Sequence, residues 1–145
     1  MNDACGSESL VGRRQFLGLV LQQEGRMDMK AKLKDLLSSD LDLRNYWPKD
    51  ERNFGFWVSM LIGPDDEEGS EIFQLLICTP DWIKSEYHNS CAVWGRHMLI
   101  VFEYDLGAIK AEIERYLGSC VGDDWHSLAM KVSRVASWEF EEYQP

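Results

Sequence analysis

The stretch FGFWVSMLIGPDDEEGSEIFQLLIC, residues 54–78, decides the fold of this chain. Within residues 54–62 every second side chain is large and apolar, which is the period of a β-strand with one buried face. The predicted buried set is Phe56, Val58, Met60 and Ile62, with Trp57, Ser59 and Leu61 on the other face. Residues 71–78 form a second apolar run. The polar turn GPDDEEGS lies between the two runs, so we expect an antiparallel hairpin with an acidic tip.

Strands are also predicted on both sides of this hairpin. Residues 29–36, MKAKLKDL, favour a first strand, which the polar and aromatic loop SSDLDLRNYWPKDERN follows. Residues 97–102, HMLIVF, are apolar on both faces, so we expect a central strand of the sheet there. The closing segment SWEFEEY, residues 137–143, alternates as a half-exposed last strand would.

Three helices are marked by their caps. Thr79 is a predicted N-cap with Pro80 at the first helical position, and Asp105 is the predicted N-cap of the next helix. That second helix has a stripe at helical spacing, followed by Gly118 as its end: Ile109, Ile113, Tyr116 and Leu117. Asp123 or Asp124 begins the third helix, whose stripe is Trp125, Leu128, Ala129, Val132 and Ala136.

The order of elements is β, β, β, α, β, α, α, β, and it defines the expected architecture. We predict a single α+β domain over residues 29–145, with a mainly antiparallel sheet of about five strands and three helices packed on it. The chain has 145 residues, of which 45% are hydrophobic, which is enough for one core.

Residues 1–28 are predicted to lie outside this domain. GRRQFLGLVLQQEGRM, residues 12–27, opens like a twin-arginine export signal, but its apolar run FLGLVL is shorter than the roughly 7 to 15 residues that such a signal needs. Gln-Glu-Gly can be encoded by a sequence that contains a ribosome-binding site just upstream of Met27 and Met29. The segment is therefore interpreted as a disordered leader or as a mis-assigned translation start.

The charge of the chain restricts its partners. It contains 15 basic and 25 acidic residues, for a net charge of −10. Such a chain repels phosphate backbones, so a nucleic-acid partner is not expected, and no segment is apolar for the roughly 20 residues that a membrane span requires. Basic proteins are the partners that this charge attracts, while the alternative is that it serves solubility alone.

Cysteine and histidine usage predicts no catalytic residues, no metal and no cofactor. The cysteines have no C-x-x-C spacing, so Cys78 and Cys120 are expected to be packed thiols in a reduced, cytoplasmic protein. Cys91 with a histidine as its base is kept as a hydrolase alternative. The three histidines and the acidic turn lack the spacing of zinc or calcium sites.

Partner-binding candidates fall into three groups. The hairpin tip offers Asp65, Asp66, Glu67, Glu68 and Glu71, the last strand offers Glu139, Glu141 and Glu142, and the first loop offers Tyr46 and Trp47. Charge runs at loop tips are often only solvated, and aromatic residues before Pro48 can pin a loop to the core as well as anchor an interface. The function of these groups stays open at this level.

A resemblance bears on that function. The "IGP" followed by an acidic turn, "CTPDWI", "GRHMLIVFEYD" and "WEFEEY" together resemble the immunity protein 8 family of bacterial polymorphic toxin systems, over about residues 29–143. The resemblance implies a small non-enzymatic cytoplasmic protein that binds a cognate toxin, with a basic nuclease as a candidate, and prevents self-intoxication. It supplies no catalytic residues. A generic acidic adaptor domain remains the main alternative.

Overall fold

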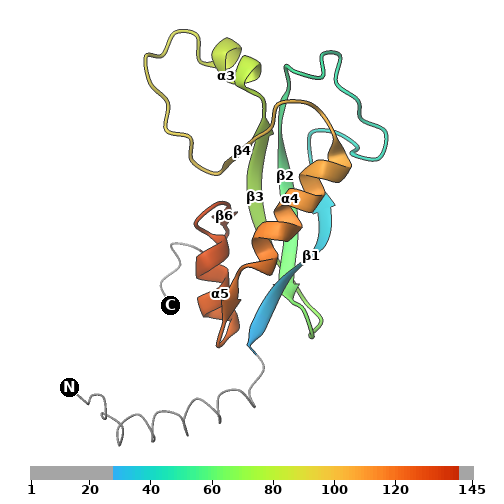
Figure 1. The fold of residues 1–145 in the computed structure, drawn as a ribbon, viewed down its shortest axis with the longest axis vertical. Helices are drawn as coiled ribbons and strands as arrows, with labels where there is room; N and C mark the ends of the chain where they lie inside the picture. The colour runs from blue at the N-terminus through green and yellow to red at the C-terminus, as the bar shows by residue number, and fades with distance from the viewer. Residues whose placement is uncertain (1–27, 141–145) are drawn as a thin grey trace, which may run out of the picture.

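The structure is a computed structural model that describes residues 28–140. Most of the predicted leader, together with Glu141 and Glu142, lies outside the described residues. The remainder is an α+β fold with a curled mixed sheet and three helices, so the predicted fold class is confirmed (Figure 1).

The predicted hairpin is the centre of the sheet. β2 (Gly55–Pro64) and β3 (Glu71–Cys78) pair antiparallel, with Phe56 opposite Ile77 and Met60 opposite Phe73. The four alternating apolar side chains of β2 are at most 3% exposed, as their period predicts. A Cβ on Gly63 would lie 2.1 Å from the carbonyl oxygen of Gly69, so the turn closes tightly enough to require glycine there.

β1 (Met29–Leu37) pairs antiparallel with β2 and contains a bulge. Leu33 lies opposite Ile62, whereas Asp35 lies opposite Leu61, so one extra residue is accommodated between them. The bulge explains why the buried residues Ala31 and Leu36 are an odd number of positions apart on one strand.

The strand order is β4-β3-β2-β1-β5, with β6 (Ser137–Trp138) also pairing with β3. The prediction of a central strand over residues 97–102 is wrong. β4 (Met98–Ile100) has three residues, lies at the edge of the sheet and runs parallel to β3. Ile100, and Phe102 just beyond the strand, are 45% and 75% exposed, so this segment is not covered on both faces. Hydrophobicity on both faces cannot distinguish a covered central strand from an edge strand of this kind.

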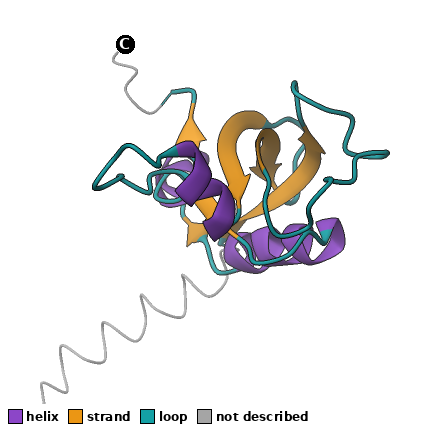
Figure 2. Ribbon diagram, turned by 90° about the horizontal axis from the view of Figure 1, so that it is seen from above, coloured by secondary structure: helices purple, strands orange, loops and turns teal. Residues whose placement is uncertain are grey.

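The two longer helices cover one face of the sheet. α4 (Leu106–Gly118) begins at the N-cap Asp105 and buries Ile109, Ile113 and Leu117, as its sequence stripe predicts. α5 (Trp125–Val132) begins at Asp124 and contributes Leu128, Ala129 and Val132 to the same core. The two-residue strand β5 (Val121–Gly122) connects them and pairs with β1. Figure 2 shows α4 lying along one side of the curled sheet.

α3 (Pro80–Glu86) is placed differently. Its N-cap Thr79 is fully buried, and the Thr79 hydroxyl oxygen accepts hydrogen bonds from the backbone N–H groups of Trp82 and Phe54 at 3.3 and 3.1 Å. Trp82 lies against Gly55, on the face of β2 opposite to Phe56, because successive residues of a strand point to opposite sides. One threonine therefore joins the start of β2 and the end of β3 to the start of α3.

One carboxylate connects the C-terminal elements to the hairpin. Oε1 of Glu71 accepts hydrogen bonds from the indole Nε1–H groups of Trp125 and Trp138, both at 2.8 Å. The Trp138 ring also stacks on Phe73, with centroids 6.0 Å apart. The predicted last strand is present only as Ser137–Trp138, since the segment that follows is exposed at Glu139 and Phe140 and is not described beyond residue 140.

Glu71→Ala should lower the free energy of unfolding by about 2–4 kcal/mol, because it removes the acceptor of two hydrogen bonds to a charged group. Glu71→Gln keeps an acceptor oxygen and should cost about 1 kcal/mol. Urea denaturation measures both, with Glu139→Ala as an exposed control that should cost less than about 1 kcal/mol. A Glu71→Ala protein as stable as wild type would show that apolar packing alone holds β6.

Gly55→Ala should lower the free energy of unfolding by about 1–3 kcal/mol, because the added methyl group would lie 2.3 Å from the Trp82 ring. Gly118→Ala is the matched control. No atom lies within 4 Å of its added Cβ at the end of α4, and it should stabilise by about 0.4–1 kcal/mol. Equal effects of the two substitutions in urea denaturation would contradict the close approach of Trp82.

Candidate partner-binding surface

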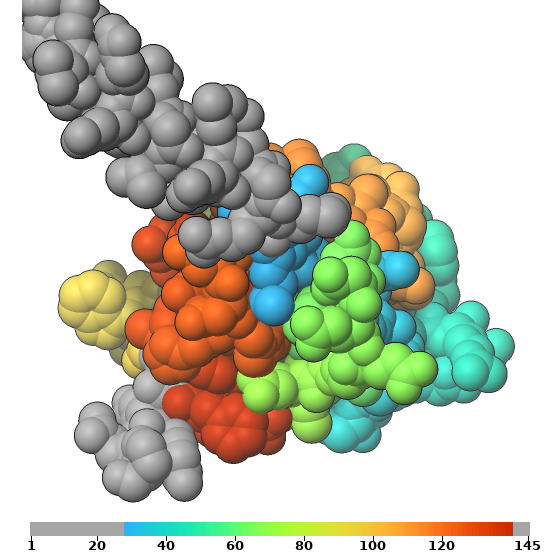
Figure 3. Space-filling model, turned by 90° about the horizontal axis from the view of Figure 1, so that it is seen from below, coloured from blue at the N-terminus to red at the C-terminus, as the bar shows by residue number. Residues whose placement is uncertain are grey.

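The acidic hairpin tip is fully exposed but has basic neighbours. Asp65, Asp66, Glu67 and Glu68 are all exposed. The neighbouring strand β1 carries three exposed lysines, namely Lys30, Lys32 and Lys34. The backbone N–H of Asp65 donates to the carbonyl of Lys30 at 2.8 Å, and the Lys34 ammonium donates to the carbonyl of Glu67. Figure 3 shows the hairpin tip, in green, beside β1, in blue. The lysines offset much of the charge at the tip.

The remaining predicted acidic candidates are arranged differently from the tip. Glu71 is half-buried and accepts the two indole hydrogen bonds described above, so its carboxylate is already engaged within the fold. Oε1 of Glu139 accepts a hydrogen bond from the backbone N–H of Ile72 at 3.2 Å, although the residue is exposed. Glu141 and Glu142 lie outside the described residues.

Tyr46 and Trp47 belong to an aromatic cluster. Both rings meet the ring of Tyr104 edge-to-face, with centroids 5.5 and 5.0 Å apart, and Tyr46 also contacts Phe56. Phe54 approaches Tyr104 at 5.3 Å. Tyr104 is 4% exposed whereas Trp47 is 62% exposed, so the cluster runs from the core to the surface. The first loop is thus pinned to the core through Tyr46 and exposed to solvent at Trp47.

Tyr104 was not among the predicted site residues. Its hydroxyl is buried and has no hydrogen-bond partner among the described residues. Burial raises the pKa of this phenol, and the proximity of Tyr46 raises it further, so the group is a neutral hydroxyl at physiological pH. A buried polar group without a partner is costly and calls for an explanation. The sequence marks Tyr104 only as one apolar residue before the cap of α4.

Tyr46, Trp47 and Tyr104 line an open hollow of about 500 Å³ between the first loop and the start of α4, which we call the loop hollow. The charged residues that line it are Arg44, Glu51, Glu103 and Asp105. The backbone N–H of Tyr104 donates to the carbonyl of Glu51 at 3.0 Å, which holds the two segments together. Asp105 also caps α4 by accepting from the backbone N–H of Ala108. The loop hollow therefore combines aromatic rings with an excess of carboxylates.

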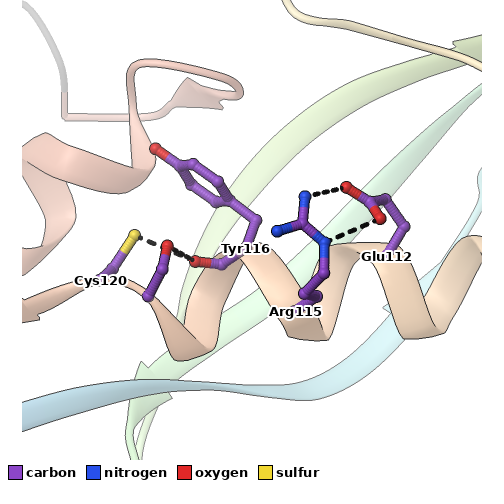
Figure 4. A network of polar contacts seen from close by, with 5 residues as sticks. Glu112, Arg115, Tyr116 and Cys120 are labelled. Atoms are coloured by element: carbon purple, nitrogen blue, oxygen red, sulfur yellow. Dashed lines mark hydrogen bonds and ion pairs between the residues drawn. The ribbon is translucent and has the colours of Figure 1, made fainter.

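Another polar network lies on the outer side of α4 (Figure 4). Glu112 and Arg115 form an exposed ion pair, and their hydrogen bond lowers the pKa of Glu112 and raises that of Arg115. The carbonyl of Tyr116 accepts from the hydroxyl of Ser119 and the thiol of Cys120, which closes the end of the helix. These contacts are local to α4 and its C-terminal end, so they stabilise the helix.

The cysteines are arranged as packed or solitary thiols. Cys78 and Cys120 are buried, as predicted, and burial raises the pKa of Cys78, which disfavours the reactive thiolate. Cys91 is exposed, and Nδ1 of the nearby His88 lies 2.9 Å from the backbone carbonyl of Ser85. Within the same residues, no group of three or more His, Cys, Asp or Glu side chains is placed to hold a metal ion.

A partly open apolar cavity of about 130 Å³ lies between the sheet and the helices. Its lining includes Met60, Leu75, Ile113 and Val132, and the half-buried Tyr116 lies at its margin.

No helix within the described part of the chain has the length and apolar character to cross a bilayer. Among the features described above, the loop hollow combines aromatic side chains, charged side chains and Tyr104, whose hydroxyl has no partner among the described residues.

The fold and the composition define a small acidic α+β domain. Residues 31–143 match the family model of Immunity protein 8, and the chain therefore belongs to this family, as the sequence resemblance predicts. Membership implies a toxin as the partner. No curated protein and no solved structure matches the chain.

Tyr104→Phe should leave the free energy of unfolding unchanged or raise it by about 1 kcal/mol, because it removes a buried hydroxyl that has no partner. Tyr116→Phe is the matched control. The Tyr116 hydroxyl donates to the carbonyl of Lys131 at 2.8 Å, so its loss should destabilise by about 1 kcal/mol. Thermal and urea unfolding measure both. A clear loss of stability in Tyr104→Phe would show that the hydroxyl has a stabilising partner.

Proposed function

We propose that this protein is an immunity protein that binds a cognate polymorphic toxin in the bacterial cytoplasm and neutralises it, which prevents self-intoxication. The match to Immunity protein 8 over most of the chain is the observation that carries this proposal. In this function the protein acts by stoichiometric binding, and its fold serves to present a surface.

The proposed toxin is basic, with a nuclease as the leading class. The net charge of −10 attracts a cationic protein and speeds its association, whereas it repels nucleic acid itself. An acidic inhibitor can therefore occupy the surface that a basic nuclease uses for its substrate. Blocking of the active site and binding beside it are both compatible with the charge.

Three surfaces are candidates for the contact: the hairpin tip with Asp65, Asp66, Glu67 and Glu68, the exposed Glu139 next to β6, and the loop hollow with Tyr46 and Trp47. The lysines of β1 weaken the field of the hairpin tip, so this tip is better suited to steering an approaching toxin than to holding it. The loop hollow offers aromatic surface that can be desolvated in a complex, which is where binding energy concentrates.

Two other functions make different predictions. A generic acidic adaptor would have no toxin-like gene beside its own and would protect no cell. A hydrolase that used Cys91 and a histidine would lose its activity in Cys91→Ala, whereas an immunity protein with this substitution should protect as well as wild type. Protection of cells that express the adjacent toxin domain, with a 1:1 complex in solution, separates the proposed function from both.

Reversal of Asp65, Asp66, Glu67 and Glu68 to lysine should leave the fold intact and slow association with the toxin domain encoded beside the gene. If one of these carboxylates is desolvated in the complex, its loss costs about 2–5 kcal/mol, which is at least tenfold in affinity. Association kinetics at low and at physiological salt measure the effect, and the wild-type on-rate should fall as salt rises.

The matched control acts in the opposite direction. Lys30→Gln with Lys32→Gln removes positive charge next to the same tip and should speed association. If the four-residue reversal, the lysine variant and wild type all associate at the same salt-independent rate, the acidic tip serves solubility alone. A second reversal, of Glu139, Glu141 and Glu142, tests the C-terminal acidic group in the same assay.

A further inference from the structure

We propose that the loop hollow is a receptor for one cationic side chain, an arginine, presented by the protein partner. The inference rests on the proposed function for the identity of that partner, but the chemistry of the hollow is argued from this chain alone. Two observations meet there: an excess of carboxylates, and the largely exposed indole of Trp47, which packs on the ring of Tyr104. The buried hydroxyl of Tyr104 has no hydrogen-bond partner among the described residues.

The charge of the hollow favours a cation. Glu51, Glu103 and Asp105 line it with three carboxylates, and Arg44 is the one basic residue among its described lining, which leaves a net charge of −2. Lys49 and Arg52 belong to the same loop, but they are not among the residues that line the hollow. A bound cation would therefore meet more negative than positive charge, with Arg44 acting against it.

The aromatic side chains favour a planar cation. Trp47 is 62% exposed, so most of the indole is available to a ligand, and indole is the aromatic group that attracts cations most strongly. A guanidinium stacks on aromatic rings and donates several hydrogen bonds in one plane, whereas an ammonium is a compact and strongly hydrated charge. A hollow with a ring on one side and carboxylates around it suits arginine better than lysine.

The Tyr104 hydroxyl supplies an acceptor that the folded protein leaves unused. Its raised pKa keeps the phenol neutral, so it offers lone pairs to an N–H donor without adding charge. The Trp47 ring packs edge-to-face on Tyr104 at 5.0 Å and is much more exposed than the rings of Tyr46, Phe54 and Phe56 around it. Rotation of Trp47 would uncover more of the Tyr104 side chain on which it packs, and such rotamer changes are common at interfaces.

The experiment uses the full chain labelled with ¹⁵N and N-acetyl-arginine amide as the probe, followed by NMR. N-acetyl-citrulline amide has nearly the same shape without the charge and serves as the matched ligand. We expect the arginine probe to shift the Trp47 indole resonance and the backbone amides of residues 103–105 with saturation, and the citrulline probe to shift them at least tenfold less at equal concentration.

Variants locate the site. Trp47→Ala and the pair Glu51→Gln with Glu103→Gln should each weaken the arginine probe at least fivefold, and Arg44→Gln should strengthen it. Tyr104→Phe should weaken it two- to fivefold while the protein stays fully folded, which a merely structural role of the hydroxyl would not produce. Trp94→Ala, at a residue that is 93% exposed and does not line the hollow, should leave it unchanged.

Two outcomes would overturn the inference. Equal shifts with both probes would exclude recognition of the charge, and shifts that are spread over the hairpin tip as much as the hollow would indicate nonspecific attraction by an acidic surface. The proposed function is judged separately. If a toxin binds the hollow variants with wild-type affinity, the immunity function stands and the hollow is rejected as an arginine receptor. If the chain binds the arginine probe with saturation but protects against no toxin, the hollow stands as an arginine receptor and the immunity function is rejected.

Discussion

One carboxylate oxygen, on β3, holds two elements that lie far from it along the chain, α5 and β6. Oε1 of Glu71 accepts hydrogen bonds from indoles 54 and 67 residues further along, at Trp125 and Trp138. α5 has eight residues and β6 has two, and elements this short are not stable on their own. The shared acceptor links both elements to β3, in addition to the stacking of Trp138 on Phe73 and the burial of Leu128, Ala129 and Val132 of α5. The same bonds engage a carboxylate that the sequence alone groups with the acidic tip.

Much of the fold was predictable because its elements are marked locally. The alternation in β2, the caps Thr79 and Asp105, and the apolar stripe of α4 each follow from neighbouring residues, and the structure confirms them. β4 was misplaced because hydrophobicity on both faces reveals neither the neighbours of a strand nor its exposure, so an edge strand and a central strand can have the same pattern. β5 was missed because two residues carry no period. The bulge in β1 likewise follows from pairing with β2, which local sequence does not encode.

The candidate site was predictable only in part, because surface function depends on which residues become neighbours. The sequence identified the acidic tip, but not the three lysines that β1 brings beside it. It identified Tyr46 and Trp47 as a possible anchor, but not the Tyr104 ring from a segment more than fifty residues later that completes their cluster. An unpartnered hydroxyl has no sequence pattern at all, since the lack of a partner is a property of the folded chain.

The acidic charge and the loop hollow would act at different stages of binding: the charge on the rate of encounter, and the hollow on the choice of partner. A net charge of −10 acts over about a Debye length, so it raises the rate of encounter with any cationic protein without distinguishing among them. Discrimination needs contacts at short range on a fixed frame. Tyr104 gives the hollow such a frame, because its N–H is bonded to the backbone carbonyl of Glu51 and its ring packs on Phe54. Phe54 is in turn bonded through both its N–H and its carbonyl to Thr79. The rim of the hollow, Trp47, is the exposed and adjustable part. The buried Tyr104 hydroxyl has no hydrogen-bond partner among the described residues, and this costs free energy in the free protein. A partner that donated a hydrogen bond to this hydroxyl would remove the cost. Binding at the hollow would therefore favour partners that carry such a donor.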